Sequence, residues 1–184
     1  IRWFMLSDSP PERDVQWSLE GVSAAFKFIQ KLWKLNTEIL KKQDSGSKTA
    51  DILLQKAVSK TVHKTTKNLE NFQYNVVIAN MHEIYNIFNQ HIVDGRTSNQ
   101  TLKNEWEKII MLLLPLTPHL AHECCKKINK KLYWPKYDPK LLEEENCKIV
   151  VQVDGRKRGI LETPINTEEK TIVKKTKQIS NVLK

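Results

Sequence analysis

The segment WSLEGVSAAFKFIQKLWKLNTEILKK occupies residues 17–42 and carries the clearest helical pattern of the chain. Its apolar residues recur at steps of three and four positions, which places them along one face of an α-helix. These apolar positions are Val22, Ala25, Phe26, Ile29, Leu32, Trp33, Ile39 and Leu40. The segment therefore predicts one long amphipathic helix, which must bury its apolar face against other helices.

The same spacing of apolar residues continues beyond a polar break at residues 43–48 (QDSGSK). Thr49 or Asp51 is the predicted cap of a second helix, and Asn75 is the predicted cap of a third. Short polar side chains suit these positions because they accept hydrogen bonds from the free N–H groups of the first turn.

Two further helices are predicted downstream. Asp94-Gly95 ends the third helix, since glycine readily adopts the left-handed conformation after a last turn. A fourth helix covers residues 97–113, and Thr117-Pro118 opens a fifth, because proline is tolerated at the first helical position. Five helices with short links predict an antiparallel bundle.

The pattern changes from helical to extended after residues 134–135. Residues 148–153 (KIVVQV) and a second extended run up to Thr163 flank Asp154-Gly155. Asp-Gly between two such runs predicts a β-hairpin. Asn166 with Glu169 resembles a capping box that opens a final helix. We expect a mainly α protein: an antiparallel helical bundle followed by a small, truncated α+β domain with one hairpin and one helix.

These patterns predict four parts of the chain. They are a connector at residues 1–16, the helical bundle at residues 17–135, a linker at residues 136–147 and a partial C-terminal α+β domain at residues 148–184. We interpret the chain as a piece of a longer protein.

Charge is unevenly distributed along the 184 residues, whose formal net charge is +9. Residues 146–184 hold nine basic and four acidic residues, whereas the first 145 residues are only slightly basic for their length, with 21 and 17. Arg156, Lys157 and Arg158 follow the predicted hairpin turn, where exposed donors can meet phosphates. No apolar run is long enough to span a bilayer, so we expect no membrane contact.

Catalytic and metal-binding patterns are missing from the chain. Two of its three cysteines, Cys124 and Cys125, are adjacent, which suits neither a disulfide framework nor a structural zinc site. His119, His122 and Cys124 leave open the alternative of a metal-dependent enzyme, but zinc needs three or four convergent ligands. No phosphate-binding, dinucleotide-binding or hydrolase motif occurs. We therefore predict no catalytic residue and no metal site in this chain.

Four segments, in order, carry a family resemblance. They are residues 2–17 (RWFMLSDSPPERDVQW), 74–83 (YNVVIANMHE), 113–123 (LLPLTPHLAHE) and 150–159 (VVQVDGRKRG). Together they closely resemble bacterial-type leucyl-tRNA synthetases, in the region that joins the catalytic core to the helical anticodon-binding domain and opens the C-terminal domain. The resemblance covers nearly the whole chain, and its hairpin segment separates the leucyl enzymes from the related isoleucyl, valyl and methionyl enzymes.

The resemblance implies that the parent enzyme joins leucine to tRNA(Leu) using ATP and Mg²⁺, and that this fragment binds tRNA without catalysing. It also implies upstream catalytic and editing domains in the same polypeptide, a monomeric state and a cytoplasmic location. No cofactor is expected in the fragment. The basic clusters of the sequence supply the predicted tRNA contacts. The leading candidates are Arg156, Lys157 and Arg158, the next are Lys174, Lys175 and Lys177, and the weaker ones are Lys27, Lys31 and Lys34.

Two alternatives remain open at this point. The chain is also compatible with the same region of an isoleucyl or valyl enzyme. It is compatible, too, with a structural or protein-interaction bundle whose lysines only keep it in solution.

Overall fold

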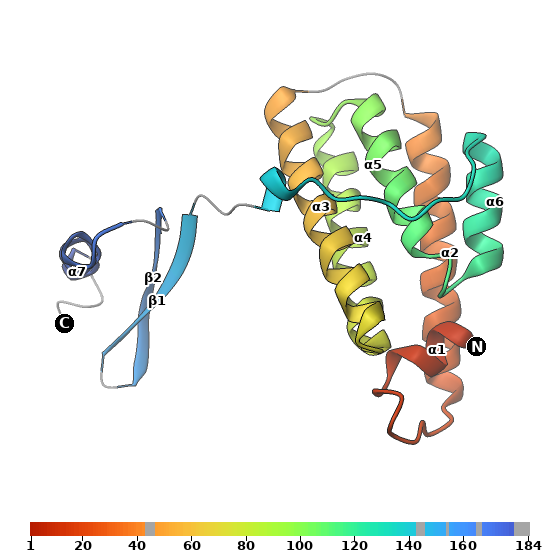
Figure 1. Ribbon diagram of the computed structural model, residues 1–184, viewed down its shortest axis with the longest axis horizontal. Helices are drawn as coiled ribbons and strands as arrows, with labels where there is room; N and C mark the ends of the chain where they lie inside the picture. Colours follow the sequence, from red (N-terminus) through yellow and green to blue (C-terminus); the bar gives the residue numbers. More distant parts are fainter. Residues whose placement is uncertain (43–46, 143–145, 154, 165–166, 179–184) are drawn as a thin grey trace. The chain divides into compact units, whose positions relative to one another are not determined.

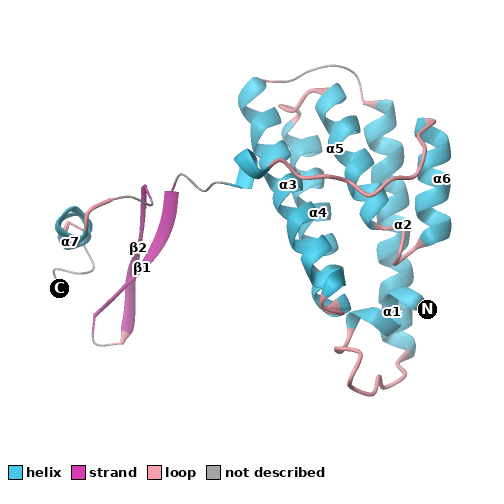
Figure 2. Cartoon of the chain, viewed as in Figure 1, coloured by secondary structure: helices cyan, strands magenta, loops and turns pink. Residues whose placement is uncertain are grey.

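The computed structural model describes residues 1–42, 47–142, 146–153, 155–164 and 167–178. The chain divides into two compact units, Ile1–Leu142 and Glu143–Lys184. The first unit is a bundle of helices, and the second holds a two-stranded antiparallel sheet and a helix (Figure 1; Figure 2). The expected fold class, a helical bundle followed by a small α+β part, is confirmed.

All five helices predicted from the apolar spacing are present, and successive ones run in opposite directions (Figure 1). They are α2 (Leu19–Lys41), α3 (Lys48–Glu70), α4 (Tyr74–Asp94), α5 (Asn99–Leu112) and α6 (Pro118–Ile128). Gly95 ends α4 as predicted, with a φ of 66°. Among the residues described, no helix combines the length and the apolar character needed to cross a membrane.

The start of α3 differs from the prediction. Ser47 is the cap of α3, and its Oγ accepts a hydrogen bond from the backbone N–H of Ala50 at 3.3 Å. Asp51 instead accepts from the backbone N–H and the hydroxyl of Ser98, both at 2.8 Å. The capping prediction for Thr49 or Asp51 is therefore wrong, because the Asp51 carboxylate holds the first turn of α5 against α3.

Two other helices begin without a side-chain cap. Helix α4 begins at Tyr74 with Gln73 before it, so the prediction that Asn75 is the cap is wrong by two positions. Helix α6 does begin at Thr117-Pro118, but the Thr117 hydroxyl donates to the carbonyl of Leu113 at 3.4 Å and accepts no bond from the first turn. Tertiary packing, more than local capping, fixes both starts.

The core of the bundle centres on Trp106 of α5, whose side chain is 1% exposed. Its indole Nε1–H donates a buried hydrogen bond to Oδ1 of Asn36 in α2 at 2.9 Å. Its ring also meets the ring of Phe88 in α4 edge to face, with centroids 5.2 Å apart. The apolar body of one side chain thus packs in the core while its single polar group is satisfied.

The segment predicted as a connector, residues 1–16, begins with a helix, α1 (Arg2–Ser7). Trp3 and Phe4 of α1 are buried in the core of the first unit, and the Trp3 ring lies 5.2 Å from that of Phe28. A helix of six residues is shorter than the window in which periodicity can be read, so the apolar pattern does not reveal it.

Gly21 of α2 lies against the Phe4 ring of α1. A Cβ atom at Gly21 would lie 2.5 Å from Cε2 of the buried Phe4 ring. We expect Gly21→Ala to lower the free energy of unfolding by about 1–2 kcal/mol, because overpacking outweighs the better helix propensity of alanine. Urea denaturation checks this, with the exposed Ser23→Ala on the same helix as the control. Equal or greater stability of Gly21→Ala would contradict this packing.

The second unit contains the predicted hairpin and final helix. Strands β1 (Asn146–Val153) and β2 (Arg156–Pro164) pair antiparallel, and α7 (Glu169–Lys177) follows. The first residues of the predicted linker belong to the first unit. That unit ends in a short 3-10 helix, η1 (Pro139–Leu142). Asp154 of the predicted turn and Asn166 of the predicted capping box lie outside the described residues.

Candidate nucleic-acid interface

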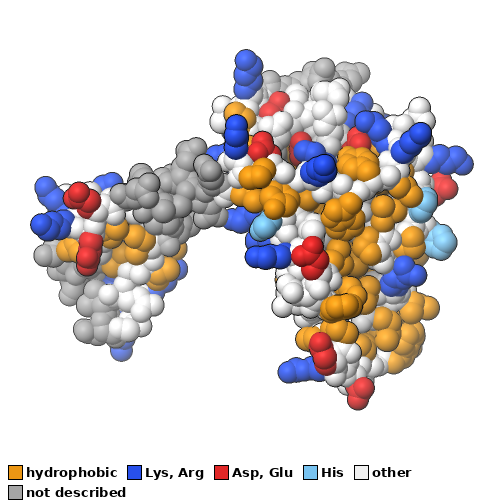
Figure 3. Space-filling view, in the orientation of Figure 1, with side chains coloured by type: hydrophobic (Ala, Val, Ile, Leu, Met, Phe, Trp, Pro, Cys, Tyr) orange, Lys and Arg blue, Asp and Glu red, His pale blue; other side chains and the backbone are white. Residues whose placement is uncertain are grey.

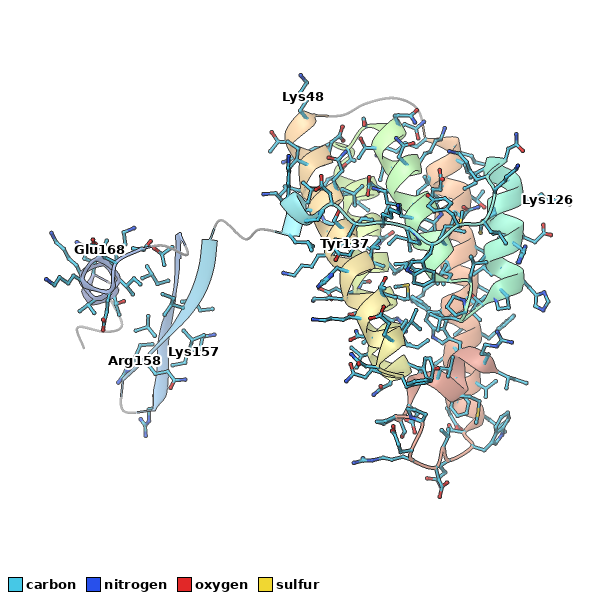
Figure 4. All side chains as sticks on the ribbon, in the orientation of Figure 1. Lys48, Lys126, Tyr137, Lys157, Arg158 and Glu168 are labelled. Atoms are coloured by element: carbon cyan, nitrogen blue, oxygen red, sulfur yellow. The ribbon has the colours of Figure 1, made fainter. Side chains whose placement is uncertain are left out.

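The basic residues of the hairpin lie just after its turn, where Gly155 adopts a φ of 74°. Val151 pairs with Gly159 and Gln152 pairs with Lys157, so Arg158 has no partner on β1 and forms a bulge. A bulge redirects the side chains around it. Arg156 and Lys157 are exposed, whereas Arg158 is half-buried. Figure 4 labels Lys157 and Arg158 on this hairpin.

The charges of this hairpin are not neutralised by any carboxylate whose position is described. No ion pair to Arg156, Lys157 or Arg158 occurs within the described residues, and the buried Nε of Arg158 has no hydrogen-bond partner there. Figure 3 shows Lys and Arg side chains spread over the surface of this unit. Phosphates therefore have access to at least the two exposed cations, Arg156 and Lys157.

Helix α7 carries the next group of predicted contacts. Lys174 and Lys175 are exposed on this helix. Lys177 is the last residue of α7, and its side chain lies outside the described residues. The structure therefore places two of the three α7 lysines at the surface.

The three α2 lysines share one exposed stripe, because Lys27, Lys31 and Lys34 are spaced four and three residues apart. The stripe is not purely basic. Lys34 Nζ lies 3.7 Å from Oε1 of Glu38, and both side chains are solvated. Burial, together with the charge of Lys31, lowers the pKa of His82 on α4. Lys31 thus lies close enough to α4 for its charge to act on His82.

A fourth basic stripe, on α3, was missed by the sequence analysis. Lys56, Lys60, Lys64 and Lys67 follow one another at steps of four, four and three residues, and all but the half-buried Lys56 are exposed. Residues 52–69 contain no acidic residue. The spacing of these lysines is visible in the sequence.

The three groups considered for metal chemistry, His119, His122 and Cys124, do not form a site among the described residues. Burial, followed by the neighbouring Cys125, raises the pKa of the Cys124 thiol to about 12, so this buried thiol stays protonated at neutral pH. His119 and His122 are exposed on α6. Among the described side chains, no three His, Cys, Asp or Glu residues come together as a metal site.

Comparison with known proteins gives a consistent result. The profile of a protein family described as the anticodon-binding domain of tRNA ligase matches residues 51–173. A leucine–tRNA ligase of Bartonella tribocorum is 35% identical over 188 residues, covering 95% of this chain and 21% of the relative. A leucine–tRNA ligase of Bartonella quintana is 36% identical over 173 residues, covering 86% and 20%. The chain thus spans about a fifth of the length of these curated relatives.

The fold also matches a solved structure. The crystal structure of a ternary complex of Agrobacterium radiobacter LeuRS, tRNA and LeuAMS superposes with a TM-score of 0.82 at 20% identity. The match covers 99% of this chain and 25% of that one. At this level of identity the likeness establishes the fold alone.

Proposed function

Because this chain belongs to the anticodon-binding domain family of tRNA ligases, we propose that it is the tRNA-docking part of a leucyl-tRNA synthetase. The observation that carries the proposal is the hairpin turn, which exposes Arg156 and Lys157 with no described carboxylate paired to them. A-form RNA hides its base edges in a deep major groove, so contacts to phosphates and to shape are the expected mode of binding.

The proposal assigns catalysis to other parts of the parent polypeptide. Upstream catalytic and editing domains would use ATP and Mg²⁺ to join leucine to tRNA(Leu), in a monomeric cytoplasmic enzyme. The bundle and the hairpin unit would hold the tRNA for that chemistry. Arg156, Lys157 and Arg158 lead the proposed contacts, followed by Lys174, Lys175 and Lys177, with Lys27, Lys31 and Lys34 third.

Filter-binding titrations of the chain test this proposal. We expect binding of tRNA(Leu) at low salt that weakens steeply as salt rises, because contacts to phosphates release counterions. Comparison with tRNA(Ile), tRNA(Val) and an unrelated tRNA separates the leucyl assignment from its isoleucyl and valyl alternatives. Absence of any tRNA binding at low salt would contradict the proposal and favour a structural bundle.

The hairpin contribution can be isolated by a double variant. Arg156→Ala/Arg158→Ala should weaken tRNA(Leu) binding about tenfold or more at low salt and reduce the slope of log affinity against log salt by up to about two. Lys41→Ala/Lys48→Ala removes the same charge from the first unit and should change both quantities little. An unchanged slope in the hairpin variant would remove these two residues from the interface.

A further inference from the structure

After α6 the chain crosses back over the helices of the first unit. Residues 129–142, here called the strap, pass over α5 and then over α3 (Figure 1). Lys130 Nζ lies 3.0 Å from Oε2 of Glu107 on α5, and the Tyr133 hydroxyl donates to Oε1 of the same carboxylate at 3.0 Å. Two polar contacts thus hold the first part of the strap to α5.

Further contacts hold the strap to α3. The Trp134 indole Nε1–H donates to the hydroxyl oxygen of Thr66 at 3.0 Å. The Tyr137 ring, labelled in Figure 4, meets the His63 ring edge to face, with centroids 4.7 Å apart. The strap ends in η1, which packs on α3. The strap therefore has a defined position on the bundle, and the space beneath it is part of the fold.

A cavity of about 510 Å³ lies between the strap, α3 and α5. This volume is within the range of small-molecule sites in proteins. Polar and charged side chains make up most of its walls. They are Gln55 and Ser59 of α3, Glu105 and Lys108 of α5, and Lys136 and Asp138 of the strap.

Glu105 is the buried charged group of this cavity. It is 3% exposed, and its two carboxylate oxygens accept hydrogen bonds from Lys108 Nζ at 2.7 and 2.9 Å. Burial still raises the pKa of Glu105, although the hydrogen bond and the charge of Lys108 oppose that rise. One cation therefore does not fully compensate this carboxylate for its removal from water, and a second positive group in the cavity would stabilise it.

The strap adds one more charge of each sign to the cavity, the exposed Lys136 and Asp138. Oδ1 of Asp138 accepts a hydrogen bond from the backbone N–H of Lys140 at 3.0 Å, which orients this carboxylate at the start of η1. Among the described residues that line the cavity, two are anionic and two are cationic. A simple anion or a simple cation would be repelled by one of these pairs, whereas a ligand with both charges complements both.

We propose that this cavity binds a free α-amino acid with a polar side chain. The ammonium group of the ligand lies near Glu105 and Asp138, and its carboxylate lies near Lys108 and Lys136. An α-amino acid carries its two opposite charges on neighbouring atoms, so both enter one small cavity, and charge-assisted hydrogen bonds are the strong ones. The inference goes beyond the proposed tRNA docking and does not depend on it, so either one can fail without the other.

The α3 wall favours a polar ligand side chain. The amide of Gln55 and the hydroxyl of Ser59 can each donate and accept hydrogen bonds. A side chain that ends in an amide can use both of these groups, and the cavity volume leaves room for it. L-Glutamine is therefore the probe for the experiment.

NMR titration of the nitrogen-labelled full chain with L-glutamine tests the proposal. We expect saturable shifts of the backbone signals around Ser59, Glu105 and Lys136, with a dissociation constant of about 0.1–5 mM for a ligand of this size. The absence of shifts up to about 20 mM would overturn the proposal, and so would saturable shifts confined to another part of the chain.

Two analogues separate the two charges of the ligand. Glutaramic acid is glutamine without the ammonium group, and γ-aminobutyramide is glutamine without the carboxylate. Each should bind about tenfold or more weakly than L-glutamine, because each loses one set of charge-assisted hydrogen bonds. Binding of either analogue as tightly as L-glutamine would overturn the proposal, because one pair of wall charges would then have no part in recognition.

Variants of the cavity walls complete the test. Glu105→Gln keeps the shape of the side chain without its charge and should weaken L-glutamine binding about tenfold or more. The double variant Lys136→Met/Asp138→Asn changes only the exposed strap and should weaken binding about threefold or more. Glu83→Gln removes an exposed carboxylate on α4, outside the cavity, and should leave binding unchanged.

Circular dichroism and urea denaturation establish that each variant folds. Wild-type affinity for L-glutamine in folded Glu105→Gln would overturn the proposal. If that variant does not fold, the strap variant decides, and wild-type affinity there would overturn the proposal equally. A comparable loss of affinity in Glu83→Gln would also overturn it, because the effect would then come from net charge and not from the cavity.

Discussion

Trp106→Ala should remove most of the folding stability of the helical bundle. Trp106 is 1% exposed, and truncating a buried Trp to Ala costs about 3–5 kcal/mol through lost burial and the cavity that remains. The variant also leaves Oδ1 of the buried Asn36 without its donor, which adds about 1 kcal/mol or more. We therefore expect a loss of about 4–6 kcal/mol, a large part of the stability of an ordinary domain.

Urea denaturation followed by far-ultraviolet circular dichroism measures this loss. The matched control is Phe26→Ala, which truncates an aromatic side chain that is 60% exposed on α2 and should cost well under about 1 kcal/mol. Trp106→Phe keeps most of the apolar volume but cannot donate to Asn36, so its effect should lie between the two. A loss below about 2 kcal/mol for Trp106→Ala would mean that this side chain is not at the centre of the core.

Lys108→Met should be the next most damaging change, because it leaves the buried carboxylate of Glu105 without its cationic partner. Glu105 is 3% exposed, and Lys108 Nζ lies 2.7 and 2.9 Å from its two carboxylate oxygens. Burial raises the pKa of Glu105, and the hydrogen bond and charge of Lys108 oppose that rise. Without Lys108, the carboxylate would have to stay charged without its partner or take up a proton, at a cost of about 1–3 kcal/mol at neutral pH.

The pH dependence of this loss follows from the direction of the pKa shift. A carboxyl group with a raised pKa in the folded state holds its proton to a higher pH than in the unfolded state, so its burial destabilises the fold most at neutral pH. Removing Lys108 strengthens that effect. The deficit of Lys108→Met should therefore be largest near pH 7 and shrink as the pH falls from 7 through the raised pKa of Glu105, because the protonated carboxyl group needs no cation.

Denaturation of wild type and variant across this pH range is the measurement. Glu105→Gln is the control, because a neutral side chain of the same shape needs no cation. It should be about as stable as the wild type at neutral pH. A Lys108→Met deficit that does not change with pH would show that lost packing, and not the stranded carboxylate, is responsible.

Much of the fold could be predicted from short-range patterns. The spacing of Leu32, Trp33 and Ile39 on α2 indicated a helix, Gly95 marked the end of α4, and Asp154-Gly155 located the hairpin. Each of these signals depends on residues a few positions apart, whose effect on the backbone is largely independent of the rest of the chain. The order of the five long helices α2 to α6 followed in the same way.

Capping and the α1 helix could not be predicted in this way. Asp51 has the chemistry of a helix cap, but a hydrogen bond to Ser98, 47 residues away, uses its carboxylate instead. Trp3 and Phe4 of α1 acquire their positions from packing on α2, where the absence of a side chain at Gly21 admits the Phe4 ring. A local pattern contains no information on such partners.

The candidate interface, too, could be predicted only in part from the sequence. The cations at positions 156–158 stood out from composition, because like charges beside a tight turn are commonly exposed, as Arg156 and Lys157 are. The lysines of α3 were equally visible in the sequence, but their meaning depends on what stands next to them.

The residues beside the α3 lysines come from a later part of the chain, which folds back onto this helix. Trp134 donates a hydrogen bond to Thr66, which lies 68 residues earlier, and Trp106 donates one to Asn36, which lies 70 residues earlier. Amino-acid order alone thus specified helices, turns and charge, because these depend on near neighbours. The tertiary structure of the first unit decided which side chains meet across the bundle. Packing and hydrogen bonding select those pairs, because the free energy of folding there comes from contacts between residues that are distant along the chain.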